Sequence, residues 1–391
     1  MIEQIFDCFC KEMQVKPDGL DAQIFLYGAG EIGRKFWEKF QDHITILGFI
    51  DSDQRKQGGH IELDGVHTLT IYSLEKVRMK FPQAKIVITT TSFQEVMQTL
   101  NNAGYQENRD YYERRNFEIL YHKAVDHILW FSFLALVVTE RCSLRCQHCI
   151  HSAPYAKEYR EIPVEEHMAD CDALFHAVDR LGRLEVMGGE ALLYRPLPKL
   201  LKHIGRHYRD RIEEYTITTN GTCPLTSELV EICRDYRIQV EISDYRNMIA
   251  PAQCAQVEYF LEELERNKIT YLLRPQDQWI NFGYQDPGAQ LKDMDQLRER
   301  YAKCKTSCHA LYRNRVYVCA SEIGGVSAGW CTERAEDVVF LKPSVEEERE
   351  ILRNRLMALD LGCPSNGYVS WCSRCRGYLA SDRVPAAKQL G

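Results

Sequence analysis

Short apolar runs alternate with amphipathic stretches over the first third of the chain. These runs cover residues 23–27, 44–50 and 85–90. Strands that alternate with helices in this way predict a parallel sheet with helices on its faces. The charged segment 107–115 breaks the pattern, so we place the first domain at residues 1–120.

A second alternation of the same kind begins with an apolar run at residues 128–138. Further apolar runs follow, with helical stretches between them, at residues 183–187, 215–219, 239–243 and 270–273. Such a series predicts a full or partial α/β barrel, and we expect a partial (β/α)6 barrel of the TIM type over residues 130–285. In barrels of this kind the chemistry gathers at the carboxyl ends of the strands.

The strand ends of this second region carry polar and special residues. They are Cys142, the GlyGlyGlu stretch at 188–190, Asn220 with Gly221, Ser243 with Asp244, and Arg274. Because the carboxyl ends of parallel strands meet at one edge of a sheet, we expect the active site of this region there.

Cysteines become frequent after about residue 285, where the periodicity weakens. They are Cys304, Cys308, Cys319, Cys331, Cys363, Cys372 and Cys375. Residues 286–391 are therefore predicted to form a third module that is organised by metal. Within it, Cys372 and Cys375 form a CxxC pair, which can bind one metal ion or one edge of a cluster.

The composition of the chain bears on which partners it binds and in which cellular compartment it works. The net charge of −7 comes from 49 basic and 56 acidic residues mixed along the chain, so nucleic acid is not an expected partner. The run at 128–138 is shorter than the roughly 20 residues that cross a bilayer, and no membrane contact is expected. The first residues lack a secretory signal, so a reducing cytoplasm is expected, where clustered cysteines among the 16 more often hold metal than form disulfides.

The sequence CSLRCQHC places the thiols of Cys142, Cys146 and Cys149 directly after the run at 128–138. A structural zinc site needs four ligands, and this group has no fourth cysteine nearby. Four-iron clusters of electron carriers are also held by four ligands, so three thiolates leave one iron open to a substrate or cofactor. A zinc or electron-transfer site with a distant fourth ligand is the alternative interpretation.

The spacing CxxxCxxC after the first barrel strand, with His148 before the last cysteine, closely resembles that of the radical S-adenosylmethionine (SAM) enzymes. Gly188, Gly189 and Glu190 match the family's GlyGlyGlu motif at the end of the second strand. This resemblance implies a four-iron cluster on the three cysteines, with SAM bound to its open iron and to the motif.

The same resemblance implies that one electron, from a donor such as flavodoxin or ferredoxin, cleaves SAM to methionine and a 5'-deoxyadenosyl radical. It also suggests that Asn220 and Ser243 contact SAM. Ordinary helix capping is the alternative role for residues of these types at strand ends.

The third module resembles the SPASM and twitch domains, which are auxiliary-cluster extensions of radical SAM enzymes. Residues 311–319 predict a hairpin that ends in Cys319, with Asn314 at its turn, where the family usually has Gly. The resemblance implies one auxiliary four-iron cluster of the twitch type, held by Cys304 or Cys308 together with Cys319, Cys372 and Cys375. A structural zinc site on the same thiolates is the alternative.

A glycine turn near the start of the chain has the context of a dinucleotide site. Gly28, Gly30 and Gly33 follow a strand and open a helix, and Asp51 ends the next strand. The segment resembles the Rossmann-like amino-terminal domains of sugar acyltransferases and nucleotide-sugar modifying enzymes. That implies a nucleotide or nucleotide-sugar ligand, and a fold without a ligand is the alternative.

Together these features predict a cytoplasmic radical SAM oxidoreductase with an auxiliary cluster as electron acceptor, and epimerisation is a second outcome of the same radical. The stretches 242–246 and 278–283 resemble radical SAM proteins of carbohydrate and aminoglycoside pathways, which favours a small sugar or nucleotide-sugar substrate. Modification of a ribosomally made peptide is the alternative among enzymes. A non-enzymatic iron–sulfur redox protein is the alternative from another class.

Overall fold

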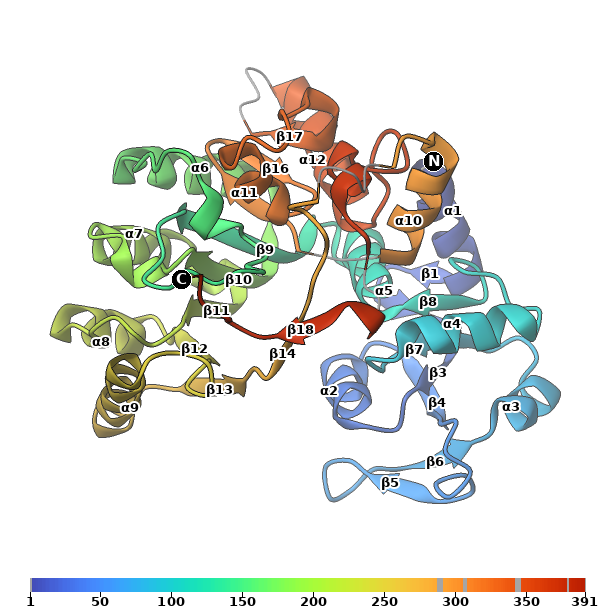
Figure 1. Ribbon diagram of the computed structural model, residues 1–391. Helices are drawn as coiled ribbons and strands as arrows, with labels where there is room; N and C mark the ends of the chain where they lie inside the picture. Colours follow the sequence, from blue (N-terminus) through green and yellow to red (C-terminus); the bar gives the residue numbers. More distant parts are fainter. Residues whose placement is uncertain (1, 287–290, 305–307, 342–345, 378–379, 391) are drawn as a thin grey trace. The chain divides into compact units, whose positions relative to one another are not determined.

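The computed structural model describes residues 2–286, 291–304, 308–341, 346–377 and 380–390. The chain divides into two compact units, Met1–Leu129 and Trp130–Gly391. Each unit combines helices with a mainly parallel sheet, so the predicted α/β class is confirmed (Figure 1). The boundary lies next to the gap that the sequence predicts between residues 120 and 130.

The first unit is built on a six-stranded sheet, counted over its described residues. In spatial order the strands are β5 (His60–Glu62), β6 (Thr68–Tyr72), β4 (Thr45–Ile50), β3 (Gln23–Tyr27), β7 (Lys85–Ile88) and β8 (Tyr111–Glu113). The pairs from β6 to β8 are parallel, and β5 runs antiparallel to β6. The three apolar runs of the sequence form β3, β4 and β7.

Helices cover both faces of this sheet. They are α1 (Ile2–Met13), α2 (Glu31–Phe40), α3 (Leu74–Lys80), α4 (Phe93–Asn102) and α5 (Arg114–Tyr121), and the short strands β1 (Val15–Lys16) and β2 (Gly19–Leu20) follow α1. Val77 of α3 and Leu100 of α4 pack with Phe25 on one face. Phe36 of α2 meets Phe117 of α5 edge to face, with ring centroids 5.5 Å apart. Figure 1 shows α2 and α5 on the other side of the sheet from α3 and α4. The parallel sheet is therefore buried on both sides, as its apolar strands require.

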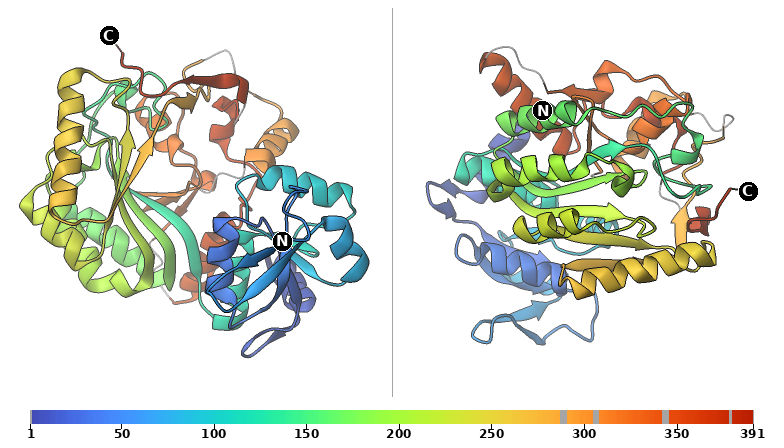
Figure 2. Two further views of the ribbon diagram at one scale, coloured as in Figure 1. Left: turned by 90° about the horizontal axis from the view of Figure 1, so that it is seen from below. Right: turned by 90° about the vertical axis from the view of Figure 1, so that its left-hand side faces the viewer.

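The second unit contains five parallel strands in chain order. They are β9 (Trp130–Thr139), β10 (Arg180–Gly188), β11 (Ile212–Thr219), β12 (Gln239–Asp244) and β13 (Tyr271–Pro275). The connecting helices α6 (Val164–Ala177), α7 (Leu197–Tyr208), α8 (Ser227–Asp235) and α9 (Pro251–Arg266) cover one face of the curved sheet (Figure 2). All five apolar runs of this region form strands, and their carboxyl ends meet at one edge.

The cysteine-rich extension continues the same sheet on the other side of β9. β15 (Ala310–Tyr312) pairs in parallel with β9, and β16 (Arg315–Tyr317) and β17 (Val338–Phe340) follow in antiparallel order. Arg313 and Asn314 form the β15–β16 turn, with φ angles of 50° and 62°. Two positive φ angles suit the right-handed twist of a hairpin, and Asn tolerates them. The predicted hairpin with Asn314 at its turn is confirmed.

Two predictions for this unit need revision. The strand after β13, β14 (Gln278–Ile280), leaves the sheet and pairs antiparallel with β18 (Arg383–Pro385). Over the described part of residues 130–285, five parallel strands and four connecting helices stand in series, so the (β/α)6 count is not reached there. The next strand, β14, finds its backbone partner in β18. The residues after 285, predicted as a separate module, add β15 to β17 to the barrel sheet and belong to the same compact unit.

The described residues of the second unit also include the α-helices α10 (Met294–Cys304), α11 (Ser321–Ser327) and α12 (Glu346–Asp360). No helix among the described residues has the length and apolar character needed to span a bilayer.

Candidate active site

The three clustered cysteines lie on the loop that follows β9. Cys142, Cys146 and Cys149 line one cavity of about 580 Å³. Leu144, Cys146 and Ala387 form a buried apolar cluster against which the other two cysteines pack. Burial raises the pKa of Cys146 to about 11. The loop thus gathers three thiols in apolar surroundings, where a bound cation would stabilise the thiolate form that burial disfavours.

Gly188 and Gly189 end β10 where it meets the cysteine loop. The Gly189 N–H donates to the Thr139 carbonyl at 2.8 Å, and the Glu190 N–H donates to the Arg141 carbonyl at 2.7 Å. A Cβ atom on Gly188 would lie 2.3 Å from the Thr139 oxygen, and one on Gly189 would lie 2.5 Å from the Arg141 oxygen. The two glycines therefore allow the β10 turn to lie directly against the loop that carries the cysteines.

The carboxylate of Glu190 joins the ends of β10 and β11. Its residue is 1% exposed. It accepts hydrogen bonds from the Thr219 hydroxyl at 2.7 Å, the Asn220 N–H at 2.8 Å and the Leu192 N–H at 3.1 Å. Burial raises the pKa of Glu190, and these three hydrogen bonds oppose the effect. The acid of the GlyGlyGlu motif thus holds two strand ends together.

Asn220 and Ser243 line the same cavity, at the ends of β11 and β12. Asn220 Nδ2 donates to Ser143 Oγ at 3.0 Å and lies 3.8 Å from Cys142 Sγ. Neither residue caps the helix that follows its strand, since α8 is capped by Thr226 and α9 begins after Ala250. The capping alternative does not apply here, and a role toward a ligand stays a prediction.

The sequence analysis missed an acid in the cavity wall, Glu185 of β10. Its carboxylate accepts hydrogen bonds from the Thr218 hydroxyl and, at 3.1 Å, from the Arg183 guanidinium. The Glu185 side chain is 14% exposed. Residues 183, 185 and 187 share one face of the strand, and this two-residue period is the signal that could have indicated Glu185.

Comparison with known proteins identifies this region. Residues 136–243 match the Radical SAM superfamily. The second unit carries a radical SAM domain. The corresponding resemblance of the sequence is thereby confirmed for this part of the chain.

Curated relatives match the chain over the radical SAM domain and its surroundings. A GTP 3',8-cyclase of Erythrobacter litoralis (strain HTCC2594) is 36% identical over 91 residues, which are 23% of this chain and 27% of that protein. A GTP 3',8-cyclase of Ectopseudomonas mendocina (strain ymp) is 30% identical over 143 residues, which are 36% of this chain and 39% of that protein. The chain therefore spans less than half the length of either relative.

Solved structures with some similarity are distant. BtrN in complex with AdoMet and 2-DOIA has a TM-score of 0.36 and 16% identity, over 63% of this chain and 93% of that one. Native anSMEcpe with bound AdoMet has a TM-score of 0.35 and 15% identity, over 56% of this chain and 79% of that one.

A radical SAM domain implies a four-iron cluster and SAM, and the residues present fit both. Among the described residues, no three His, Cys, Asp or Glu side chains lie close enough to bind a single metal ion. The cysteines of a four-iron cluster bind different iron atoms and stand further apart. The cavity of about 580 Å³ lies within the range of about 300–1,000 Å³ that is usual for small-molecule sites.

Several of the predicted auxiliary ligands in the extension lie near one another. Burial raises the pKa of Tyr284, and the neighbouring thiols of Cys319, Cys375 and Cys304 add to this effect. Burial likewise raises the pKa of Cys372 to about 12, with smaller contributions from Cys375 and Cys304. Four of the five predicted auxiliary ligands are therefore neighbours around Tyr284.

Cys308, the fifth candidate, lies in the wall of the radical SAM cavity. Burial raises its pKa to about 11, and the carboxylate of Glu185 adds to the effect. The prediction left Cys304 and Cys308 as alternatives for one ligand position. Cys308 also lies near Cys319, since burial raises the pKa of Cys319 and the thiol of Cys308 adds to the effect, so both residues stay candidates.

The first unit has its own glycine turn, between β3 and α2. Gly28 has a φ of 129°, and a Cβ atom there would lie 2.6 Å from the Thr89 carbonyl oxygen. A Cβ atom on Gly33 would lie 2.4 Å from the Gly28 oxygen, whereas one on Gly30 would meet nothing within 4 Å. The strand, turn and helix follow one another as the sequence predicts.

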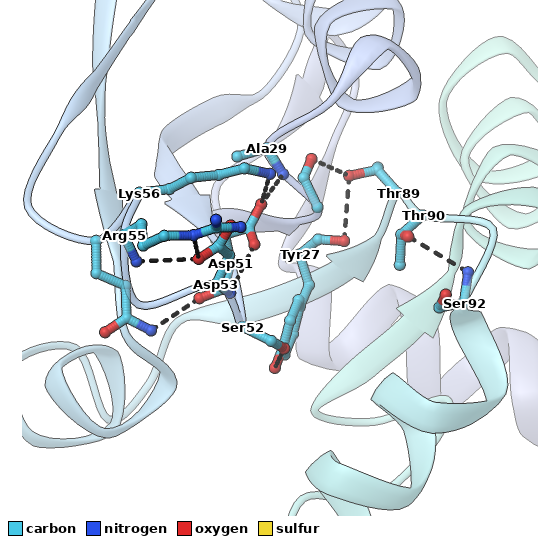
Figure 3. A network of polar contacts seen from close by, with 12 residues as sticks. Tyr27, Ala29, Asp51, Ser52, Asp53, Arg55, Lys56, Thr89, Thr90 and Ser92 are labelled. Carbon is cyan, nitrogen blue, oxygen red and sulfur yellow. Dashed lines mark hydrogen bonds and ion pairs between the residues drawn. The ribbon is translucent and has the colours of Figure 1, made fainter.

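Asp51 ends β4 and contacts this turn (Figure 3). Its carboxylate accepts hydrogen bonds from the Ala29 N–H at 3.3 Å and the Asp53 N–H at 2.9 Å, and pairs with Lys56 Nζ at 2.9 Å. Burial alone would raise the pKa of Asp51, but Lys56 and the two amides together hold it below its ordinary value. The carboxylate is thus engaged by its own unit, and its contact with a nucleotide ribose stays a prediction.

Proposed function

We propose that this protein is a radical SAM enzyme that oxidises a sugar or nucleotide-sugar by removing a carbon-bound hydrogen. The observation that carries the proposal is one shared cavity. Its wall contains the three cysteines, the glycine turn of β10 and the carboxylate of Glu185. The cysteines suit an iron–sulfur cluster and the glycine turn suits SAM, whereas neither cofactor requires the carboxylate of Glu185.

Each part of the cavity has a role in this proposal. The loop with Cys142, Cys146 and Cys149 would hold the cluster, and the strand ends at Gly189 and Asn220 would hold SAM. When bound, the cluster supplies the electron that cleaves SAM to methionine and a 5'-deoxyadenosyl radical. Apolar residues of β14 in the cavity wall would keep water away from so reactive a species.

Glu185 suits the role of the base that oxidation of an alcohol needs. When hydrogen leaves a carbon that bears a hydroxyl, loss of the hydroxyl proton makes the remaining electron easier to remove. The hydrogen atom would go to the 5'-deoxyadenosyl radical, which becomes 5'-deoxyadenosine, the proton to Glu185 and the electron to an acceptor, which leaves a ketone. Thr218 and Arg183 fix the carboxylate in one orientation, so the base is positioned in advance.

We also propose that Cys304, rather than Cys308, joins Cys319, Cys372 and Cys375 at an auxiliary cluster. The proximity of Cys304 to Cys372 and to Tyr284 supports this choice. A cluster there would supply the electron acceptor. Cys308 is then a thiol in the cavity wall, and if it returned a hydrogen atom to the substrate radical, the same site would epimerise instead of oxidise.

The glycine turn of the first unit is the proposed site for a nucleotide or nucleotide-sugar. Helix α2 begins after Gly30 without a side-chain cap, so its first N–H groups suit a phosphate. Lys56, which pairs with Asp51 beside the turn, adds a positive charge for the same group.

A purine nucleotide such as GTP is the second candidate substrate. The relatives that are 36% and 30% identical over parts of this chain are named GTP 3',8-cyclases. These matches cover 27% and 39% of those proteins, so this candidate rests on the shared radical SAM region.

The first test is the conversion of SAM to 5'-deoxyadenosine by anaerobically reconstituted, reduced protein, measured by liquid chromatography. We expect turnover by the native chain and none by a C142A/C146A/C149A variant. A C372A/C375A variant should retain part of it, and each variant should lose about four of about eight irons. A fully loaded native protein that leaves SAM intact would refute the enzyme proposal.

The second test concerns the substrate. Candidate nucleotide-sugars, free sugars and GTP, each deuterated at carbon, are incubated with the enzyme, and deuterium in 5'-deoxyadenosine identifies the molecule that is attacked. With that substrate, E185Q should still cleave SAM but form the ketone about 100-fold more slowly. An unchanged rate of ketone formation by E185Q would remove Glu185 from the role of base.

A further inference from the structure

The segment that follows β18 reaches from the wall of the cavity to the cysteine loop. β18 pairs with β14 (Figure 1). Arg383 and Trp279 of these strands line the cavity. After β18, the Ala386 N–H donates to the Asp277 carbonyl at 3.0 Å. The chain is therefore fixed in position before it reaches the cysteines.

Residues 388–390 then pair with the cysteine loop itself. Cys146 and Gln389 form an antiparallel bridge although they lie 243 positions apart in the sequence. Two backbone hydrogen bonds of 2.7 Å flank the bridge, from the Gln147 N–H to the Lys388 carbonyl and from the Leu390 N–H to the Arg145 carbonyl. The backbone on both sides of Cys146 is thus held by a distant part of the chain.

The side chain of Gln389 connects this segment with the sulfur of Cys146. Its Oε1 accepts a hydrogen bond from the Arg145 N–H at 2.8 Å. Its Nε2 lies 3.3 Å from Cys146 Sγ and 2.6 Å from the Ala387 carbonyl, and donates to both. The neighbouring Ala387 is fully buried against Leu144 and Cys146, with a φ of 52°. That conformation is unfavourable for alanine, so the packing holds it in place.

We propose that Gln389 is a positioning residue of the radical SAM site. It fixes the cysteine loop and donates a hydrogen bond to the sulfur of Cys146, which would raise the reduction potential of a cluster bound there. Hydrogen bonds to cluster sulfurs stabilise the more negative, reduced state, and residues behind the ligands tune metal sites in this way. This part of the inference rests on the proposed cluster at Cys142, Cys146 and Cys149.

The variant Q389E separates the acceptor contact of the side chain from its two donor contacts. Its carboxylate can still accept from the Arg145 N–H, but it cannot donate to Cys146 Sγ or to the Ala387 carbonyl. We expect a full complement of iron and a lower midpoint potential, measured by redox titration of the electron paramagnetic resonance signal that changes when SAM is added. The control is L390A, which keeps the backbone hydrogen bond and the native potential. An unshifted potential in Q389E, or an equal shift in L390A, would overturn the tuning role.

A second measurement needs neither cluster nor SAM. Hydrogen exchange of the loop 142–149 is followed by mass spectrometry in the apoprotein and in a variant that lacks residues 387–391. Because Arg145 and Gln147 lose their acceptors, their amides should exchange about tenfold faster or more in the variant. Equal exchange in the two proteins would show that the segment does not hold the loop. This measurement tests whether residues 388–390 hold the cysteine loop, and it does so even if the proposed function is wrong.

Discussion

Glu190 of the radical SAM unit and Asp51 of the first unit both follow a strand of a parallel sheet, and both lie beside a glycine turn. Glu190 is 1% exposed and accepts hydrogen bonds from a hydroxyl and two amides. The Asp51 side chain is 14% exposed and pairs with Lys56 as well as with amides. Burial raises the pKa of Glu190, whereas Lys56 and the amides outweigh burial and lower that of Asp51.

The difference between Glu190 and Asp51 shows that similar sequence patterns, an acid beside a glycine turn, can have different structural roles. An acid that is buried among neutral donors, such as Glu190, holds its neighbouring loops in place, and its carboxylate is not available to a ligand. An acid paired with a lysine near the surface leaves a charge pair for which a ligand can compete. The two turns differ at one glycine. Gly189 lies directly against the cysteine loop, and Gly28 and Gly33 of the first turn are as tightly enclosed, whereas Gly30 meets nothing within 4 Å. We therefore regard the radical SAM turn as rigid and the first turn as adaptable at Gly30.

The largest expected effect comes from adding one methyl group to each turn. In G189A the new Cβ would press on the Arg141 and Glu140 carbonyl oxygens, at 2.5 and 2.6 Å, and displace the cysteine loop. We expect the formation of 5'-deoxyadenosine to fall about 100-fold, since small misplacements of reacting groups have effects of this size. The matched variant G30A should keep the native rate and melting temperature. A G189A enzyme with native turnover would contradict the rigid turn.

The second expected effect concerns stability. E190A leaves the buried donors of Thr219, Asn220 and Leu192 without an acceptor, and each such loss costs about 1–3 kcal/mol. We expect the free energy of unfolding to fall by about 3 kcal/mol or more, as measured by urea titration. D51A should lose about 1 kcal/mol, because water can reach the groups it leaves behind. Equal losses in the two variants would remove the contrast between the acids.

Much of this architecture could be predicted from the sequence because its signals are local. Apolar runs mark strands, CSLRCQHC marks the cysteine loop, and Asn314 between two short apolar stretches marks the hairpin. Each of these patterns lies within about ten residues. The radical SAM domain could be recognised for the same reason, since its cysteines lie between residues 142 and 149 and its GlyGlyGlu motif is the contiguous stretch 188–190.

The rest depends on contacts between distant segments. Gln389 reaches Cys146 across 243 positions, and no pattern near either residue indicates the pairing. The pairing of β14 with β18, instead of with the barrel sheet, likewise has no signal in the nearby sequence. Cys304 and Cys308 are four positions apart, and only the path of the chain into β15 places one of them in the cavity wall. Glu185 was missed because an acid in a predicted strand is normally expected to face solvent. The sequence does not show that β10 lies between β9 and β11, with Glu185 in the cavity wall.

The smallest expected effect is a difference in pH dependence between the two acids. The pKa of Asp51 is lowered in the folded protein, so its stabilisation is full above the ordinary aspartate pKa of about 4 and is lost as the pH falls through the lower folded value. The pKa of Glu190 is raised, so the stability it contributes falls as the pH rises from about 4.3 toward its folded value. Urea titrations of D51N, E190Q and the native chain between pH 3 and 7 measure both effects, which are on the order of 1 kcal/mol. The advantage of the native chain over D51N should grow with pH, and its advantage over E190Q should shrink. If both stability differences changed with pH in the same direction, the two acids would have the same kind of environment. The contrast between a rigid and an adaptable turn would then lose its physical basis.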